Sequence, residues 1–349
     1  MTVLAPKEGM SHVVGPTDAP LLDLTIPALV ANAVDRFGQN EAAVFSAQGI
    51  RKTYAEFAQD VDALATGLLG LGLARGARIG IWSPNRYEWV LAQFATARIG
   101  LLLVNINPAY RLNELEFALN KEACSALITA RSFKTSDYIG MIQTLAPELA
   151  SATPGALQAA QLPSLRAVIA MGDATPPGMI GFDDLMVAPD SAALDAITAE
   201  LTPHDAINIQ FTSGTTGRPK GATLTHRNIV NNAGFVTARI NLLAGEKLCI
   251  PVPLYHCFGM VMGVLGAVTK GATMVFPGEA FGPVETLQAL EAEKCAGLYA
   301  VPTMLLALRQ ELDSQPRDLS ALRTGIMAGA LCPIEVMRAV QSTMGMHEL

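Results

Sequence analysis

A regular alternation of short apolar runs with helix-like segments limits the folds open to this sequence. Residues 77–82, 101–105 and 125–130 are dominated by aliphatic side chains. Between them lie residues 87–99 and 113–121, which have the length and composition of helices. Strands that are apolar along their whole length are typical of parallel sheets covered by helices on both faces. The pattern therefore predicts an α/β fold.

The alternation continues on both sides of a proline-rich stretch. Apolar residues at helical spacing predict helices over residues 26–37 and 54–71. Further apolar runs predict strands at residues 165–171, 206–211, 247–251, 272–276, 298–301 and 324–327. We expect an N-terminal tail (1–24), a first α/β subdomain (25–150), a proline-rich connecting region (151–204) and a second α/β subdomain (205–349).

Composition excludes two classes of protein. Half of the 349 residues are hydrophobic and only 16% are charged, whereas intrinsic disorder requires low hydrophobicity and high charge. The formal net charge is −7, so no basic surplus is available to neutralise the phosphates of a nucleic acid. We therefore expect a large folded core and no nucleic-acid partner. Oligomeric state stays open.

Membrane insertion and export are also disfavoured. The longest run without charged residues, 248–269, is interrupted by Pro251, Pro253 and His256, and its remaining apolar part is too short to span a bilayer. The first 20 residues contain no apolar block of the kind found in signal peptides. The five cysteines form no Cys-x-x-Cys pair, which fits a reducing compartment. We expect a cytoplasmic protein without a transmembrane segment.

One segment combines the residue types needed to bind a polyphosphate. Residues 211–221 read FTSGTTGRPKG and follow a predicted strand. Glycines allow backbone N–H groups to approach an anion closely, hydroxyls add donors, and Arg218 and Lys220 add positive charge. A flexible surface turn is the alternative interpretation. The segment is not a Walker A loop, because Pro219 precedes the lysine and Gly221 follows it.

This segment resembles the phosphate-binding signature of the adenylate-forming superfamily, which includes acyl-CoA synthetases, amino-acid adenylation domains and luciferases. Other elements of the superfamily follow in the same order. They are Ser83-Pro84-Asn85-Arg86-Tyr87-Glu88, Thr225-His226-Arg227-Asn228, Pro253-Leu254-Tyr255-His256-Cys257-Phe258-Gly259 and Ala328-Gly329-Ala330-Leu331-Cys332-Pro333. The Tyr-His form at 255–256 and the apolar residues after it look most like fatty acyl-CoA synthetases of the medium-chain kind. The resemblance implies a large two-lobed adenylation domain built of layered α/β subdomains.

The resemblance also implies a two-step reaction. A carboxylate attacks the α-phosphate of ATP to give acyl-AMP and pyrophosphate, and the thiol of CoA then displaces AMP. Both reactants of the first step are anions, so charge neutralisation and alignment matter more than a base, and Mg²⁺ supplies part of the neutralisation. By resemblance, the phosphates and the nucleotide would be bound by Thr212, Ser213, Gly214, Thr215, Thr216, Gly217, Arg218, Lys220, Gly329 and Ala330. Thr216 would lie near the metal.

His256 would stand at the carboxylate end of the acyl site in this family, where its ring could donate a hydrogen bond to the substrate. A histidine beside apolar residues is otherwise most often a core residue. Cys257, Phe258 and Met260 would line the acyl tunnel, with plain core packing as the alternative. Together with Thr216 and Lys220, His256 is a candidate catalytic residue.

Several family elements are absent from the 349 residues, including Tyr-Gly-x-Thr-Glu, Thr-Gly-Asp and the small lid domain with its lysine. On this ground we expect an N-terminal fragment with little ligase activity of its own. Two other functions remain open: a catalytically incomplete nucleotide- or acyl-binding protein, and an adenylation enzyme for an aryl acid. No acidic side chain lies between Pro251 and Lys270 that could hold an α-amine, which disfavours amino-acid substrates.

Overall fold

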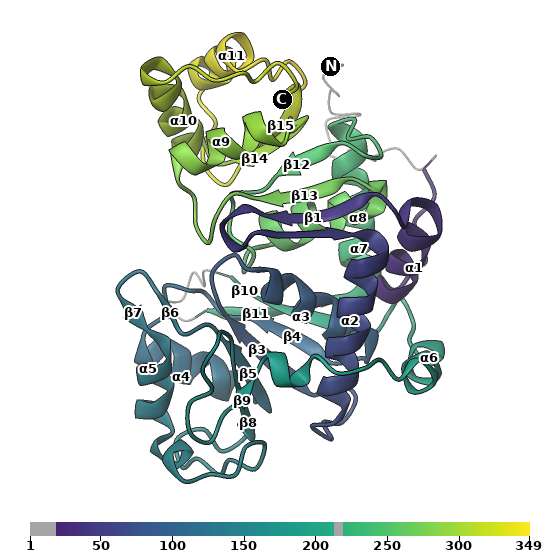
Figure 1. Ribbon diagram of the computed structural model, residues 1–349, viewed down its shortest axis with the longest axis vertical. Coiled ribbons are helices and arrows are strands. Elements are labelled where there is room, and N and C mark those ends of the chain that lie inside the picture. Colours follow the sequence, from purple (N-terminus) through teal and green to yellow (C-terminus); the bar gives the residue numbers. More distant parts are fainter. Residues whose placement is uncertain (1–18, 213–218) are drawn as a thin grey trace, which may run out of the picture.

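The computed structural model describes residues 19–212 and 219–349. A seven-stranded sheet forms its lower half in Figure 1, in the order β11-β10-β4-β3-β5-β8-β9. All neighbouring strands are parallel except β11, which runs antiparallel to β10. The strands are β3 (Arg78–Trp82), β4 (Leu102–Asn105), β5 (Ala126–Thr129), β8 (Ala167–Ala170), β9 (Ile180–Gly181), β10 (Ala206–Thr212) and β11 (Lys220–Thr225). A short β6–β7 ladder (Ser132–Phe133 and Ser136–Asp137) stands apart.

A second sheet of six strands has the order β15-β14-β12-β13-β1-β2, with only β2 antiparallel to its neighbour. Its strands are β1 (Glu41–Phe45), β2 (Ile50–Thr53), β12 (Lys247–Cys249), β13 (Thr273–Phe276), β14 (Gly297–Ala300) and β15 (Thr324–Met327). The apolar runs predicted as strands thus form β3, β4, β5, β8, β10 and β12–β15, so the α/β class with parallel sheets is confirmed.

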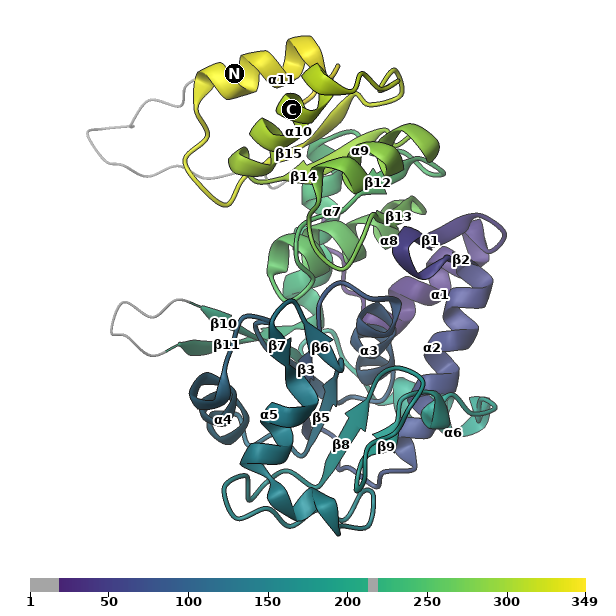
Figure 2. The ribbon, with the colours of Figure 1, turned by 60° about the vertical axis from the view of Figure 1, so that its left-hand side comes forward.

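Helices cover the faces of both sheets (Figures 1 and 2). Helix α2 packs on β1 and β2 and also on α3, which in turn packs on β3 and β4. The helices are α1 (Ile26–Phe37), α2 (Tyr54–Leu69), α3 (Tyr87–Arg98), α4 (Leu112–Lys121), α5 (Tyr138–Leu145), α6 (Ser191–Ala199), α7 (His226–Arg239), α8 (Gly266–Lys270), α9 (Pro283–Ala292), α10 (Pro302–Ser314) and α11 (Ile334–Thr343). One buried cluster extends from Ile26 to Tyr299, so residues far apart in sequence share a core.

The two sheets do not follow the expected division of the chain into residues 25–150 and 205–349. Strands β1 and β2 come from the first part but join β13 of the second, and β10 and β11 come from the second part but join β4 of the first. Sequence periodicity identifies strands but not their partners, because parallel pairing is non-local. The subdomain boundaries themselves stay a prediction.

None of the described helices is long and apolar enough to cross a lipid bilayer. The uncharged run 248–269 instead passes from β12 through a loop into a π-helix (Phe258–Leu265) and then into α8. This π-helix was not predicted. Its eight residues continue directly from the loop that contains His256, and π-helical turns are frequent at functional sites.

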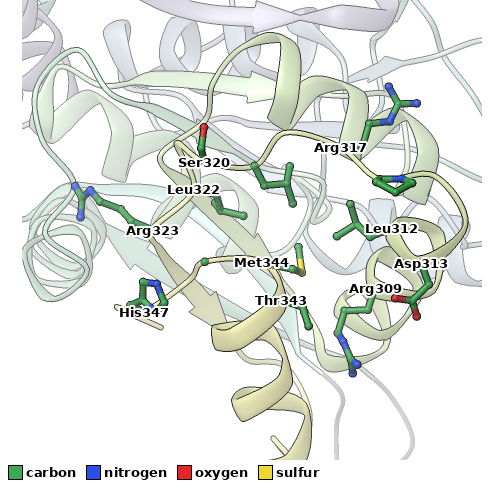
Figure 3. Close-up of a pocket in the computed structure, with 13 residues that line it drawn as sticks. Arg309, Leu312, Asp313, Arg317, Ser320, Leu322, Arg323, Thr343, Met344 and His347 are labelled. Atoms are coloured by element: carbon green, nitrogen blue, oxygen red, sulfur yellow. The ribbon is translucent and has the colours of Figure 1, made fainter.

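An open cavity of about 520 Å³ lies in the C-terminal part of the fold, between α10, the loop after it and the segment after α11 (Figure 3). Its basic side chains are largely engaged by carboxylates. Arg317 pairs with Glu291 at 3.0 Å, and Arg323 pairs with Glu246 at 2.6 Å. No residue predicted for the site lines this cavity.

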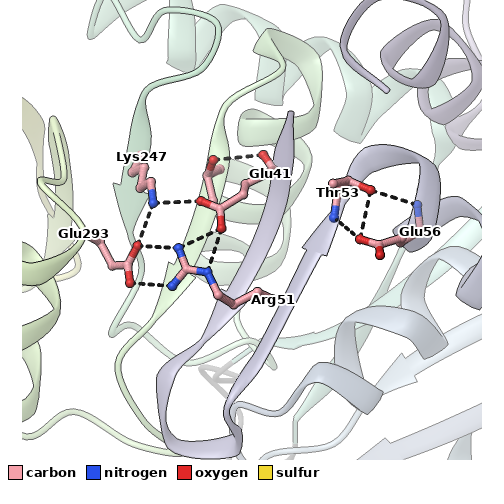
Figure 4. A network of polar contacts seen from close by, with 7 residues as sticks. Glu41, Arg51, Thr53, Glu56, Lys247 and Glu293 are labelled. Atoms are coloured by element: carbon pink, nitrogen blue, oxygen red, sulfur yellow. Dashed lines mark hydrogen bonds and ion pairs between the residues drawn. The ribbon is translucent and has the colours of Figure 1, made fainter. Parts of the chain in front are cut away.

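A network of four charged side chains fastens the β1–β2 hairpin to the rest of its sheet (Figure 4). Arg51 donates to both Glu41 and Glu293, and the Lys247 ammonium contacts the same two carboxylates at 2.8 and 2.6 Å. Hydrogen bonds from Arg51 and Lys247 lower the pKa of Glu293 to about 2. The network therefore joins β1, β2, β12 and the residue that follows α9.

Candidate active site

The order of strands in the six-stranded sheet marks a place for a ligand. From β12 the chain passes to β13 on one side and then to β14 on the other, so the strand order reverses between β12 and β14. In open α/β sheets, ligands bind outside the carboxyl ends of the strands at such a point. The segments that leave this edge contain His256 after β12 and Gly329 after β15.

The carboxyl ends of the seven-stranded sheet reach the same segment. Asn85, just after β3, donates from Nδ2 to the carbonyl of Val252 at 3.0 Å and accepts from the N–H of Leu254 at 2.8 Å. Asn105, the last residue of β4, lies 3.5 Å from the carbonyl of Tyr255. The segment before the π-helix therefore lies where the carboxyl ends of both sheets meet.

His256 is exposed at this junction. Its Nδ1 accepts a hydrogen bond from the backbone N–H of Phe258 at 3.1 Å. Partial burial lowers the pKa of the ring, so the imidazole is neutral at pH 7. With Nδ1 as acceptor, the proton lies on Nε2, which gives the neutral ring one N–H donor. The geometry fits a hydrogen bond to a substrate oxygen better than it fits a general base.

The three residues expected to line the acyl tunnel are placed differently from one another. Cys257 is exposed, and partial burial raises the pKa of its thiol, which disfavours a thiolate nucleophile. Phe258 and Met260 are 5% and 0% exposed and belong to the core. The Phe258 ring stacks on that of Tyr299 with a centroid distance of 5.3 Å. Core packing therefore describes two of the three positions.

The predicted phosphate loop connects β10 to β11. Thr212 ends β10 and donates from its hydroxyl to the carbonyl of Lys220, which begins β11, at 3.4 Å. Both side chains are exposed. The remaining predicted loop residues lie outside the described residues: Ser213, Gly214, Thr215, Thr216, Gly217 and Arg218. The antiparallel register pairs Thr212 with Lys220, so the two ends of the loop are held together.

Gly329 and Ala330 follow β15 and are exposed. Gly329 has φ = 83°, a left-handed conformation that favours glycine. A Cβ atom there would stand 3.0 Å from Cγ1 of Val301, which follows β14. The backbone after β15 thus passes close to the end of β14, beside the point where the strand order reverses.

Sequence reasoning missed three buried amides next to these residues. Asn105, Asn208 and Gln210 are 1%, 2% and 7% exposed. Asn208 donates to Oδ1 of Asn105, and Gln210 donates to Oδ1 of Asn208, each at 3.0 Å. The available signal was the presence of uncharged polar residues inside otherwise apolar strands, since buried amides require partners.

The expected Mg²⁺ has no cluster of protein ligands in the part of the chain that the structure describes. Within residues 19–212 and 219–349, no group of three or more His, Cys, Asp or Glu side chains is placed to hold a metal ion. The metal position predicted at Thr216 lies outside these residues. Its assignment stays a prediction that rests on the loop motif.

The fold has the features of the large domain of an adenylate-forming enzyme: the glycine-rich sequence connects β10 to β11, and the Tyr-His segment lies where the carboxyl ends of the two sheets meet. The AMP-binding enzyme family matches residues 30–349, and the chain belongs to this family.

The relatives found by sequence are named as acyl-CoA ligases. The chain is 46% identical over 344 residues to the medium-chain acyl-CoA ligase ACSF2, mitochondrial, of Danio rerio, covering 97% of this chain and 57% of that protein. It is 41% identical to the putative acyl-CoA synthetase YngI of Bacillus subtilis (strain 168), covering 95% of this chain and 61% of the relative. The chain therefore spans about three fifths of the length of these relatives.

Solved structures show the same fold. The anthranilate CoA ligase AuaEII in complex with anthranoyl-AMP superposes with a TM-score of 0.79 at 21% identity, over 94% of this chain and 59% of that one. A fatty acyl CoA synthetase of Mycobacterium tuberculosis gives a TM-score of 0.75 at 22% identity, over 92% and 58%. The expected adenylation-domain fold is confirmed.

Proposed function

We propose that the whole protein is an ATP-dependent acyl-CoA synthetase that converts a fatty acid, of medium chain length, into acyl-AMP and then into acyl-CoA. One observation carries the proposal: His256 and the two ends of the phosphate loop are presented by strands and loops at the carboxyl ends of two facing parallel sheets. Membership of the AMP-binding enzyme family supports the use of ATP, and the names of the relatives support CoA and a medium-chain acid.

The loop would bind the phosphates of ATP through its backbone N–H groups and hydroxyls, with Thr216 near Mg²⁺ and Lys220 beside the leaving pyrophosphate. Mg²⁺ would withdraw charge from the phosphates. His256 would donate from Nε2 to the substrate carboxylate and orient it toward the α-phosphate. Gly329 and Ala330 would border the nucleotide.

The place of action in the cell is a separate question. Cytoplasmic location stays a prediction, which rests on the unpaired cysteines. All five cysteines are free. The ACSF2 relatives carry the word mitochondrial in their names, so fractionation of cells that express the tagged protein is the direct test.

Measurement of ATP–pyrophosphate exchange tests the reaction. We expect the whole protein to catalyse this exchange with octanoate. The exchange rate should fall at least tenfold in Lys220→Ala and in Thr216→Val. Lys294→Ala, an exposed lysine in the loop after α9, serves as the control. Unchanged exchange in Lys220→Ala would remove the phosphate-loop assignment. Exchange with benzoate instead of octanoate would favour the aryl-acid alternative.

A further inference from the structure

We propose that Gln210, Asn208 and Asn105 are positioning residues, which form an amide relay that holds the end of β10, where the predicted phosphate loop begins, in register with His256. The proposal rests on the proposed function, because it concerns the alignment of the two substrates of acyl-AMP formation.

The three side chains donate in a single direction. Nε2 of Gln210 donates to Oδ1 of Asn208 at 3.0 Å, and Nδ2 of Asn208 donates to Oδ1 of Asn105 at 3.0 Å. Nδ2 of Asn105 then points to the carbonyl of Tyr255 at 3.5 Å. Hydrogen bonds aligned in this way polarise one another, especially away from water.

The relay lies in a part of the fold where packing alone would favour apolar residues. Asn105 and Asn208 lie on two neighbouring strands that are each paired on both sides, β4 and β10, and both are almost completely buried. Burying an amide costs free energy unless its polar atoms find partners. Asn208 Nδ2 also donates to the carbonyl of Leu103 at 3.0 Å, so both of its N–H groups are used. The side chains therefore specify one arrangement of β10 and β4.

The two ends of the relay lie next to the two halves of the candidate site. Gln210 stands two residues before Thr212 on β10, where the phosphate loop begins. Tyr255 immediately precedes His256, the expected partner of the carboxylate. The attack of a carboxylate on a phosphate requires close and aligned approach, and a misplacement of about 1 Å can cost about 100-fold in rate. A rigid link between β10 and Tyr255 would provide this alignment.

Asn85 serves as a structural contrast. It holds the same segment through Val252 and Leu254, but it follows β3 and makes no hydrogen bond to β10 among the described residues. Loss of Asn85 would loosen the His256 segment as a whole. Loss of the relay would change how the two halves of the site lie relative to each other, and the buried groups left unpaired would also lower stability.

Two substitutions separate the links of the relay. Asn208→Leu removes the central amide at similar volume. Asn105→Asp keeps an acceptor for Asn208 but replaces the amide donor to Tyr255 by a carboxyl group, which when ionised has no donor and also places a negative charge in the buried site. Asn231→Leu is the matched control. Asn231 is also a buried amide, 7% exposed, which bonds to Leu22 and Arg227 away from the relay.

Two readouts test the proposal. In the whole protein, we expect kcat for octanoyl-AMP formation to fall at least tenfold in Asn208→Leu and in Asn105→Asp. The KM values for ATP and octanoate should change less than threefold, because each half of the site is retained. The NMR signal of His256 is assigned as the histidine signal that disappears in His256→Gln. This signal should shift in both relay variants and should not shift in Asn231→Leu.

Each outcome decides between the relay and the proposed function. If the unmodified protein forms octanoyl-AMP and Asn208→Leu forms it equally fast, the relay is wrong and the function stands. If the unmodified protein forms no acyl-AMP, the proposed function fails, and the NMR signal of His256 still tests the link. An unshifted His256 signal in both relay variants would overturn the positioning role.

Discussion

The two segments that carry the candidate site are supported in opposite ways. Residues 250–265 are fixed by buried groups, with Asn85 on one side and the core residues Phe258 and Met260 on the other. The β10–β11 hairpin lies at the edge of its sheet, and β11 is paired on one side only. Its described ends, Thr212 and Lys220, are exposed.

This difference suits the two substrates of the proposed function. A carboxylate is small and needs one well-placed donor, so a fixed segment is favourable. A triphosphate needs many donors arranged around it, which a loop between two strands can supply. The hairpin then depends on the contacts at its base, namely the pairing of β10 with β4 and the packing of α7 on β11. Substitutions in the two segments test how firmly each one is held.

The largest effect is expected for Asn85→Leu. The substitution leaves the carbonyl of Val252 and the N–H of Leu254 buried without their partner, and each such group costs about 1–3 kcal/mol. We expect the free energy of unfolding to fall by about 4 kcal/mol for the two groups together. Thr212→Val in the hairpin should change it by less than about 0.5 kcal/mol, because it removes one long, exposed hydrogen bond.

Urea titration followed by circular dichroism measures both variants. A loss for Asn85→Leu no larger than that for Thr212→Val would show that the His256 segment is not held by buried bonds. The comparison of the two segments would then lose its basis. A large loss in Thr212→Val would indicate instead that the hairpin end is as firmly fixed as the segment opposite.

Acid should weaken the support behind the hairpin. His226, the first residue of α7, is fully buried, and its Nδ1 accepts from the N–H of Ile26 at 3.1 Å. Burial lowers the pKa of His226 to about 4, although the nearby Asp205 carboxylate opposes the shift. The unfolded chain binds the proton near pH 6.5 and the folded chain does not. This contribution to stability is complete above pH 6.5 and is lost as the pH falls toward 4, by about 3 kcal/mol.

Thermal unfolding between pH 7.5 and 4 measures this loss. His226→Asn keeps an acceptor near the position of Nδ1 and cannot be protonated, so its melting temperature should fall less with acid than that of the unmodified protein. Equal pH dependence in the two proteins would show that another group governs the acid response. The Glu293 carboxylate, whose pKa is lowered from 4.5 to about 2, begins to add to the loss as the pH falls through 4.5, at the acidic end of this range.

The sequence allowed most elements to be predicted, but not how they meet. Apolar runs such as residues 125–130 marked buried strands. Strand β2 was missed because it carries Arg51 and Lys52 at an edge and has no apolar run, and β1 was missed although four of its five residues are apolar and buried.

Candidate site residues could be proposed from the sequence where a motif carries them, but not where packing places them. The loop and His256 are predictions that rest on their resemblance to a family. Asn208 was not found, because its importance depends on Asn105, about a hundred residues earlier in the chain, lying on the neighbouring strand. The sequence likewise could not distinguish a core position of Met260 from a tunnel position, since an apolar side chain after a binding segment fits both.

A pair of glycines gives the smallest and most direct comparison of the two segments. A Cβ on Gly259, in the π-helix, would stand 2.4 Å from the backbone carbonyl oxygen of Pro253. A Cβ on Gly221, in β11, would meet the carboxylate oxygen of Glu122 at 2.3 Å, but that atom ends a flexible side chain that can turn away. Gly259→Ala must therefore displace backbone beside His256, whereas Gly221→Ala needs a rotamer change of Glu122 and a small shift of Ile209, whose Cγ2 would lie 3.0 Å from the Cβ.

We expect Gly259→Ala to lower the free energy of unfolding by about 2 kcal/mol, as overpacking in a core does. Gly221→Ala should change it by less than about 0.5 kcal/mol, because alanine is tolerated in a strand at least as well as glycine. Urea titration of the two variants side by side measures the difference. Equal losses would mean that the strand at the hairpin is as tightly packed as the segment next to His256, and the contrast between a fixed carboxylate side and an adaptable phosphate side would have to be abandoned.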